Sequence, residues 1–173
     1  KSNPLFAVLA PATYQPQGGQ QALRPGPVVG YSQQRDTAAV NAYLAQADIK
    51  SILPGNLKLM WGVKPISPET KVFEIYAIKT TGLNGEAALE GDVITDARED
   101  IGQTGAPEVS MAMNSDGARQ WQKITGAAAG PPQSENDNKS VAIVLDGMVY
   151  TAPRVSNEIP GGRSQITGNF TID

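Results

Sequence analysis

Apolar and polar side chains alternate most clearly along residues 109–114. Val109, Met111 and Met113 occupy every second position, and small or polar residues fill the positions between them. A period of two residues is typical of a strand with one buried and one exposed face. Residues 91–105 in front of this strand predict a first strand followed by a glycine-containing turn.

A helix is expected directly after the methionine strand. Ala118, Trp121 and Ile124 follow one another at a spacing of three residues, which places them on one helix face. Ser115 or Asp116 can cap the helix, because either side-chain oxygen can accept a hydrogen bond from a free amide of the first turn. We therefore expect the apolar helix face to pack on the methionine strand.

The first ninety residues predict a succession of short elements. In chain order these are a buried strand at 5–10, an exposed Gln-, Gly- and Pro-rich loop at 12–27, a strand at 28–31, a helix at 36–47 capped by Asp36, a further turn from Asp48, and a hairpin of strands 57–63 and 72–79.

The last fifty residues predict two more strand regions after a polar loop at 126–139. Asp146-Gly147 lies between the apolar runs 141–145 and 148–151, and such a pair favours a two-residue hairpin turn with positive φ at both positions. A final strand is expected at 164–172, after the flexible Gly161-Gly162 pair.

These elements predict an α+β fold with antiparallel sheets, two or three helices and many loops. At 173 residues the chain is expected to form one domain, with an N-terminal lobe (1–89) and a second lobe (90–173). The 18 Gly and 13 Pro residues are consistent with the loop content.

Composition narrows the function classes. The net charge of -3, with Lys and Arg scattered along the chain, argues against a nucleic-acid partner. The chain has no Cys and no His, which excludes Ser-His and Cys-His catalytic pairs and removes the commonest metal ligands. We therefore expect no enzyme activity, no cofactor, no catalytic residues and no metal site.

Carboxylates at regular spacing are the main catalytic alternative. Asp92, Asp96 and Asp100 would share a face if they lay on a helix, and could then act as acid-base groups or cation ligands. Val93-Ile94-Thr95 favours a strand instead, so solvated charge is the preferred interpretation.

Several soft or aromatic side chains could contact an unfolded polypeptide. For methionines and tryptophans in alternating patterns, core packing is the favoured interpretation, and a polypeptide-binding groove is the alternative. The candidate contacts are Met111, Met113, Trp121, Met148 and Tyr150.

No apolar window of about 18 residues occurs, so no membrane span is expected within these residues. The chain also lacks the pattern of a signal peptide and begins at Lys1 without Met. We interpret it as a piece of a longer protein. The isolated piece is expected to be a monomer, because its apolar runs are short.

Four separated motifs resemble the SecD family, and most closely the SecD half of fused SecDF proteins. They are GDVITDA (91–97), SMAMNSDGARQWQKIT (110–125), VAIVLDGMVYTAP (141–153) and GGRSQITGNFTI (161–172). Within the first motif the signature positions are Gly91, Asp92, Ile94, Thr95, Asp96 and Ala97.

The resemblance implies the head of a large periplasmic domain in a multi-pass inner-membrane subunit of the bacterial Sec translocon. Such a protein is expected to work with the SecYEG translocon and other Sec accessory subunits, contacting emerging unfolded preprotein and assisting export driven by the proton motive force. The resemblance also implies head movement, for which we predict a hinge at Gly161, Gly162 and Gly168. Two alternatives stay open: a periplasmic carboxylate-dependent hydrolase, and a stand-alone peptide- or carbohydrate-binding module.

Overall fold

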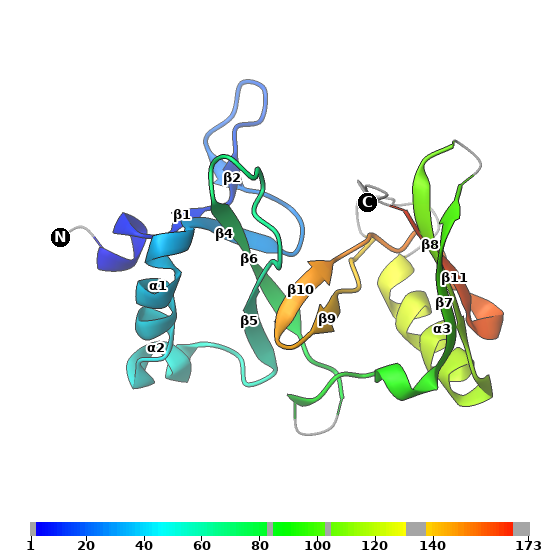
Figure 1. Cartoon of the computed structure of the whole chain (residues 1–173). Helices are drawn as coiled ribbons and strands as arrows, with labels where there is room; N and C mark the ends of the chain where they lie inside the picture. Colours follow the sequence, from blue (N-terminus) through cyan, green and yellow to red (C-terminus); the bar gives the residue numbers. More distant parts are fainter. Residues whose placement is uncertain (1–2, 83–84, 103–104, 131–137, 168–173) are drawn as a thin grey trace. The chain divides into compact units, whose positions relative to one another are not determined.

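The computed structural model describes residues 3–82, 85–102, 105–130 and 138–167 (Figure 1). It confirms the α+β class, since several antiparallel sheets are combined with few helices. By contact the chain forms two compact units, the first containing residues 1–80 with 142–152 and the second containing 81–141 with 153–173. The lobes 1–89 and 90–173 stay a prediction.

The first unit is built on a four-stranded antiparallel sheet. Its strands lie in the order β1 (Ala10–Pro11), β4 (Val28–Gln33), β6 (Val72–Lys79) and β5 (Leu57–Trp61). The expected strand at 28–31 and the expected hairpin of residues 57–79 are both confirmed.

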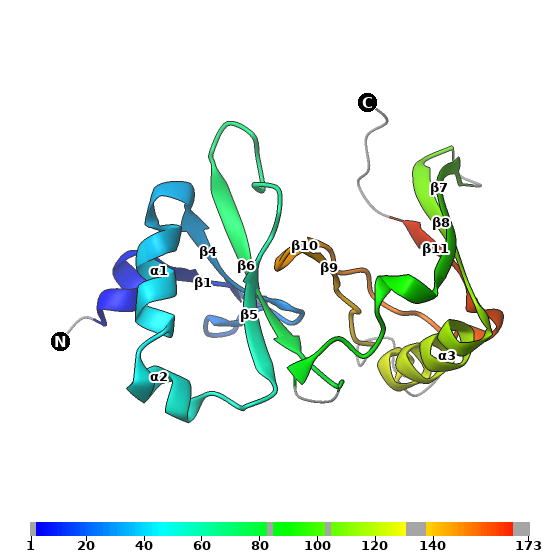
Figure 2. The ribbon, with the colours of Figure 1, turned by 60° about the horizontal axis from the view of Figure 1, so that its bottom comes forward.

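Helices α1 (Thr37–Leu44) and α2 (Ala47–Ile52) lie beside this sheet in both views (Figures 1 and 2). Val40 of α1 and Ile75 of β6 are fully buried, and the indole Nε1 of Trp61 donates a hydrogen bond of 2.9 Å to Asn41 Oδ1. The helix expected to reach residue 47 ends earlier, because Gln46 adopts extended backbone angles and α2 begins after it.

The expected strand at 5–10 is wrong for most of its length. Pro4–Ala7 forms a 3₁₀-helix, which begins with a proline and is capped by Asn3, whose Oδ1 accepts a hydrogen bond of 3.1 Å from the Leu5 amide. Proline is well suited to the first helical position because it has no amide to satisfy. Only Ala10 of this run enters a strand, in β1.

The expected loop at 12–27 contains a small hairpin. Strands β2 (Thr13–Tyr14) and β3 (Ala22–Leu23) pair antiparallel, and Ala12 in front of them is buried. The Gln- and Gly-rich tract therefore forms the connection of a hairpin, with Gly18 at a φ of 73°.

The hairpin at Asp146-Gly147 is confirmed. Strands β9 (Ile143–Leu145) and β10 (Met148–Thr151) pair antiparallel, and φ is 51° at Asp146 and 75° at Gly147. The carbonyl of the buried Val149 accepts a hydrogen bond of 2.9 Å from the amide of Val63, just beyond β5. This contact attaches the hairpin to the first unit.

Gly147→Val is expected to lower the free energy of unfolding by more than about 1 kcal/mol, because a β-branched residue is strained at positive φ. The space around Gly147 is open, so the effect isolates backbone strain. Gly55→Val is the matched control, since Gly55 also has open space but no positive φ. Urea denaturation of both variants measures the difference, and equal midpoints would contradict the turn assignment.

The second unit has a three-stranded antiparallel sheet with one long helix. The strand order is β11 (Arg163–Thr167), β8 (Pro107–Met113) and β7 (Ile94–Ile101), and α3 (Ser115–Ala129) lies against this sheet in both views (Figures 1 and 2). The expected succession of strand, turn, strand and helix is confirmed. The last strand, expected at 164–172, is confirmed for residues 164–167 and begins one residue earlier, and its remainder lies outside the described residues.

Three details of α3 differ from expectation. The cap is Asn114, whose Oδ1 accepts a hydrogen bond of 2.8 Å from the Gly117 amide, and not Ser115 or Asp116. The helix continues to Ala129, so the polar loop expected from residue 126 begins later. Its buried face is formed by Gly117, Trp121, Thr125 and Ala128, whereas Ala118 and Ile124 lie at its border.

Candidate polypeptide-contact surface

The signature segment 91–97 anchors the start of α3. Val93 is buried, its carbonyl accepts a hydrogen bond of 2.9 Å from the amide of the cap residue Asn114, and its side chain lies against Gly117. A Cβ atom at Gly117 would lie 2.7 Å from Val93 Cβ, so a larger residue does not fit there. Of the predicted signature positions, Ile94 is half-buried, and the others, Gly91, Asp92, Thr95, Asp96 and Ala97, are exposed.

Trp121 belongs to the core of the second unit. Only 8 % of its surface is exposed, and its indole Nε1 donates a hydrogen bond of 2.6 Å to Ser164 Oγ on β11. One helical turn further, the fully buried Thr125 accepts a hydrogen bond of 3.0 Å from the Ile159 amide. A polypeptide contact at Trp121 stays a prediction, and it would require this packing to open.

Met111 and Met113 lie on the side of β8 that α3 covers. Met111 is directly opposite Ser164, the hydrogen-bond partner of Trp121, and opposite residues of paired strands share a face. Both methionines are half-buried. The expected packing of the helix face on the methionine strand is therefore confirmed, and a polypeptide contact at either residue stays a prediction.

The three candidate aspartates do not form a helical row. Asp92 lies in a 3₁₀-turn (Gly91–Val93), whereas Asp96 and Asp100 lie in strand β7, as the β-prone sequence predicts. All three are exposed. Within the described part of the chain, no group of three or more His, Cys, Asp or Glu side chains is placed to hold a metal ion.

The β9–β10 hairpin carries the most accessible of the candidate contacts. Leu145 pairs directly with Met148, whereas Ile143 pairs with Thr151 beyond a bulge in β10 that contains Tyr150. Leu145 is 57 % exposed and Tyr150 is 53 % exposed, while Ile143 and Met148 are half-buried. We name these four residues the hairpin surface. Asp146 in the turn is the single charged residue between Val141 and Pro153.

The candidate contacts are thus divided between the two compact units. Met111, Met113 and Trp121 belong to the second unit, and Met148 and Tyr150 belong to the first. Leu145 was not predicted as a contact. Its position beside the turn was a usable signal, because a two-residue hairpin places both residues that flank the turn on the same face.

The hinge glycines have different surroundings. Gly161 and Gly162 lie in a 3₁₀-turn (Pro160–Gly162) with φ of 80° and 66°, and Gly168 lies outside the described residues. Gly161 has open space around it, whereas Gly162 is buried against Ala118 of α3. The hinge stays a prediction.

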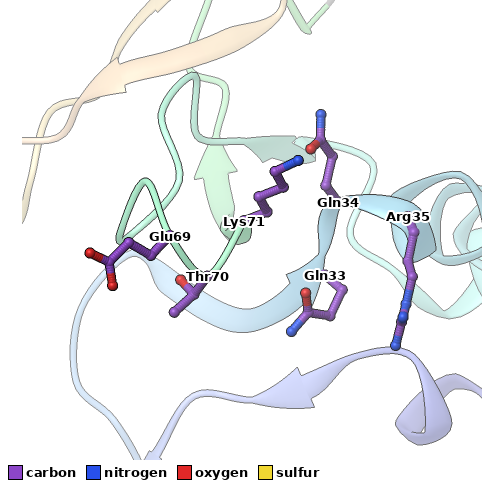
Figure 3. Close-up of a pocket in the computed structure, with 6 residues that line it drawn as sticks. All are labelled: Gln33, Gln34, Arg35, Glu69, Thr70 and Lys71. Atoms are coloured by element: carbon purple, nitrogen blue, oxygen red, sulfur yellow. The ribbon is translucent and has the colours of Figure 1, made fainter.

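The first unit also has an open hollow of about 420 Å³ (Figure 3). It is lined by Gln33, Gln34, Arg35, Glu69, Thr70 and Lys71. Glu69 is the one carboxylate among these residues, and the carboxylate-dependent hydrolase would need two in a cleft. The hollow therefore gives no support to that alternative.

One ionisable group in the first sheet is strongly perturbed. Burial, together with the hydrogen bond of 2.6 Å that its hydroxyl donates to Glu74 Oε2, raises the pKa of Tyr76 well above its ordinary value. The hydroxyl therefore stays protonated and continues to donate this bond at neutral pH. Tyr76 supports the sheet and is not among the candidate contacts.

The fold and the hairpin surface define a small α+β module with an exposed apolar hairpin and a second sheet covered by one helix. The family model that matches this chain is that of the SecDF P1 head subdomain, over residues 71–173. The chain belongs to this protein translocase family.

Curated relatives agree with the family assignment. Protein translocase subunit SecD of Rhodothermus marinus is 39 % identical over 166 residues, covering 96 % of this chain and 23 % of the relative. Protein translocase subunit SecDF of Thermus thermophilus is 36 % identical over 89 residues, covering 51 % of this chain and 11 % of the relative. The chain thus spans less than a quarter of these relatives.

Among solved structures, SecDF of Thermus thermophilus, described as a translocon-associated membrane protein, is similar to this chain. The TM-score is 0.44 at 23 % identity, and the match covers 95 % of this chain and 22 % of that one. The described residues of the present chain include no helix that is long and apolar enough to cross a membrane.

Proposed function

We propose that this chain is part of the periplasmic head of a SecD or SecDF translocase subunit and that it contacts emerging preprotein through the hairpin surface. The observation that carries the proposal is the exposure of Leu145 and Tyr150 on an apolar hairpin with a single charged residue. Apolar side chains of this kind can contact many unfolded sequences, because their contacts are not directional.

The module acts by contact and not by catalysis. Its relatives bear the name of protein translocase subunits, and a surface that binds an unfolded chain weakly and releases it suits such a role. In the full-length protein, a multi-pass subunit at the periplasmic side of the inner membrane, this contact assists export driven by the proton motive force. The SecYEG translocon and other Sec accessory subunits are its partners there.

A photo-crosslinking amino acid at Tyr150 or Leu145 of the full-length protein is expected to crosslink to a preprotein arrested during translocation. The same amino acid at Lys123, an exposed position of α3, is the control, because this position lies outside the hairpin surface. The crosslinks at 145 and 150 should exceed those at 123 several-fold. Equal yields at all three positions, or none, would contradict the proposal.

A further inference from the structure

Strand β9 has one edge that pairs with β10 and a second edge that faces away from it. Within the described residues, β9 and β10 form a sheet of two strands, so no other strand pairs with the second edge. In a hairpin with a two-residue turn, the residues that flank the turn are the hydrogen-bonded pair. Here these are Leu145 and Met148.

The next pair, Val144 and Val149, must then direct its backbone groups away from the hairpin. On the β10 side this is observed directly, because the outward carbonyl of Val149 accepts the hydrogen bond from Val63. By the same alternation, the N–H and C=O groups of Val144 point outward from β9. Val144 as a whole is 38 % exposed, and no other described strand pairs with these two groups.

The β9 edge carries no charge, proline or bulge, and its length of three residues is the one feature that limits strand pairing. Proteins protect exposed edges with charged residues, prolines or bulges on the edge strand. The edge strand β7 of the second unit follows this rule, with charges at Asp96, Arg98, Glu99 and Asp100. Strand β9 reads Ile-Val-Leu and has none of these features, and the bulge of this hairpin lies on β10.

We propose that an extended, uncharged segment of unfolded polypeptide adds to the free edge of β9 as a third strand. This inference rests on the proposed function and specifies how the contact is made. Main-chain hydrogen bonds to Val144 would hold any sequence, and the exposed Leu145 would favour segments with alternating apolar residues. A strand of three residues offers few such bonds, so we expect a Kd of about 10⁻⁴ M or weaker.

The test uses this 173-residue chain and a fluorescent ten-residue peptide in which leucine and glutamine alternate. Val144→Pro removes the outward N–H group without removing a hydrogen bond to β10, and proline is tolerated at such edge positions. We expect it to weaken peptide binding about fivefold or more, the loss of one hydrogen bond. Val144→Thr is the matched control, because it keeps both backbone groups and the β-branched shape.

Amide hydrogen exchange of the unmodified chain provides a second measurement that does not depend on the folding of the variant. The Val144 amide is expected to exchange about tenfold more slowly at a peptide concentration ten times the Kd. Unchanged exchange at Val144, or equal peptide affinity of the proline and threonine variants, would overturn strand addition while leaving the crosslinking result untouched. Absence of both peptide binding and crosslinking would reject the proposed function as well.

A second copy of the chain is the competing occupant of this edge. Protection of the Val144 amide that rises with protein concentration without peptide, together with a dimer in sedimentation, would overturn the proposal in favour of pairing between two β9 strands.

Discussion

Gly162→Ala is expected to lower the free energy of unfolding by about 2 to 5 kcal/mol. A Cβ atom at this position would lie 2.6 Å from Ala118 Cβ and 3.0 Å from Ala118 Cα, and the helix backbone cannot move aside easily. Overpacking of this kind costs about 1 to 3 kcal/mol. The positive φ of 66° adds about 1 to 2 kcal/mol for a residue with a Cβ atom.

Gly161→Ala is the matched control, because Gly161 has a similar φ of 80° but no atom within 4 Å of an added Cβ. Urea denaturation should show a loss of about 1 to 2 kcal/mol for this variant, from backbone strain alone. Equal losses for the two variants would show that Gly162 is not packed against α3.

The comparison also bears on the predicted hinge. A hinge residue changes its φ and ψ angles during movement, so the close packing of Gly162 against Ala118 and Met113 would oppose such a role. Gly161 is not packed in this way, because no atom lies within 4 Å of a Cβ added there. If the hinge lies in this turn, Gly161→Ala in the full-length protein should slow preprotein release more than Gly162→Ala does, when the two are compared at equal amounts of folded protein.

Trp121→Ala is expected to destabilise the second unit by about 3 to 5 kcal/mol, the range for removing a large buried aromatic side chain. Trp121 is almost fully buried, and its loss would also leave the Oγ atom of the buried Ser164 without this hydrogen-bond donor. Thermal unfolding measures this loss of stability. It is followed by circular dichroism of the backbone and not by tryptophan fluorescence, because the variant lacks Trp121.

Tyr150→Ala is the control for Trp121→Ala, because both residues are aromatic candidate contacts and only Tyr150 is exposed. It should change the free energy of unfolding by at most about 0.5 kcal/mol and weaken binding of the leucine–glutamine peptide. A large loss of stability in Tyr150→Ala with no change in binding would mean that the tyrosine is structural.

The order of the elements along the sequence does not show to which compact unit the hairpin of residues 142–152 belongs. It follows the helix of the second unit in sequence, yet it folds with the first unit, where Val149 is buried. One of the family motifs therefore contributes to both units. Val149 of the hairpin is buried in this attachment, whereas Leu145 and Tyr150 of the hairpin surface stay exposed.

Local physical chemistry determined the parts that the sequence predicts correctly. Positive φ at Asp146-Gly147 depends on those two residues themselves, and the alternation along β8 reflects a period set by the backbone. The resemblance to SecD rests on four motifs in order, and the family match confirms it.

The tertiary structure decided which of several locally acceptable choices was used. Asn114, Ser115 and Asp116 can all cap a helix, and Asn114 is the cap because its amide is held by the carbonyl of Val93, 21 residues earlier. Trp121 and Tyr150 are both amphipathic, and Trp121 can be buried without an unsatisfied N–H group because Ser164 of β11 accepts its indole hydrogen bond. Each choice depends on partners distant in sequence, and a local pattern contains no information about which partner a side chain will meet.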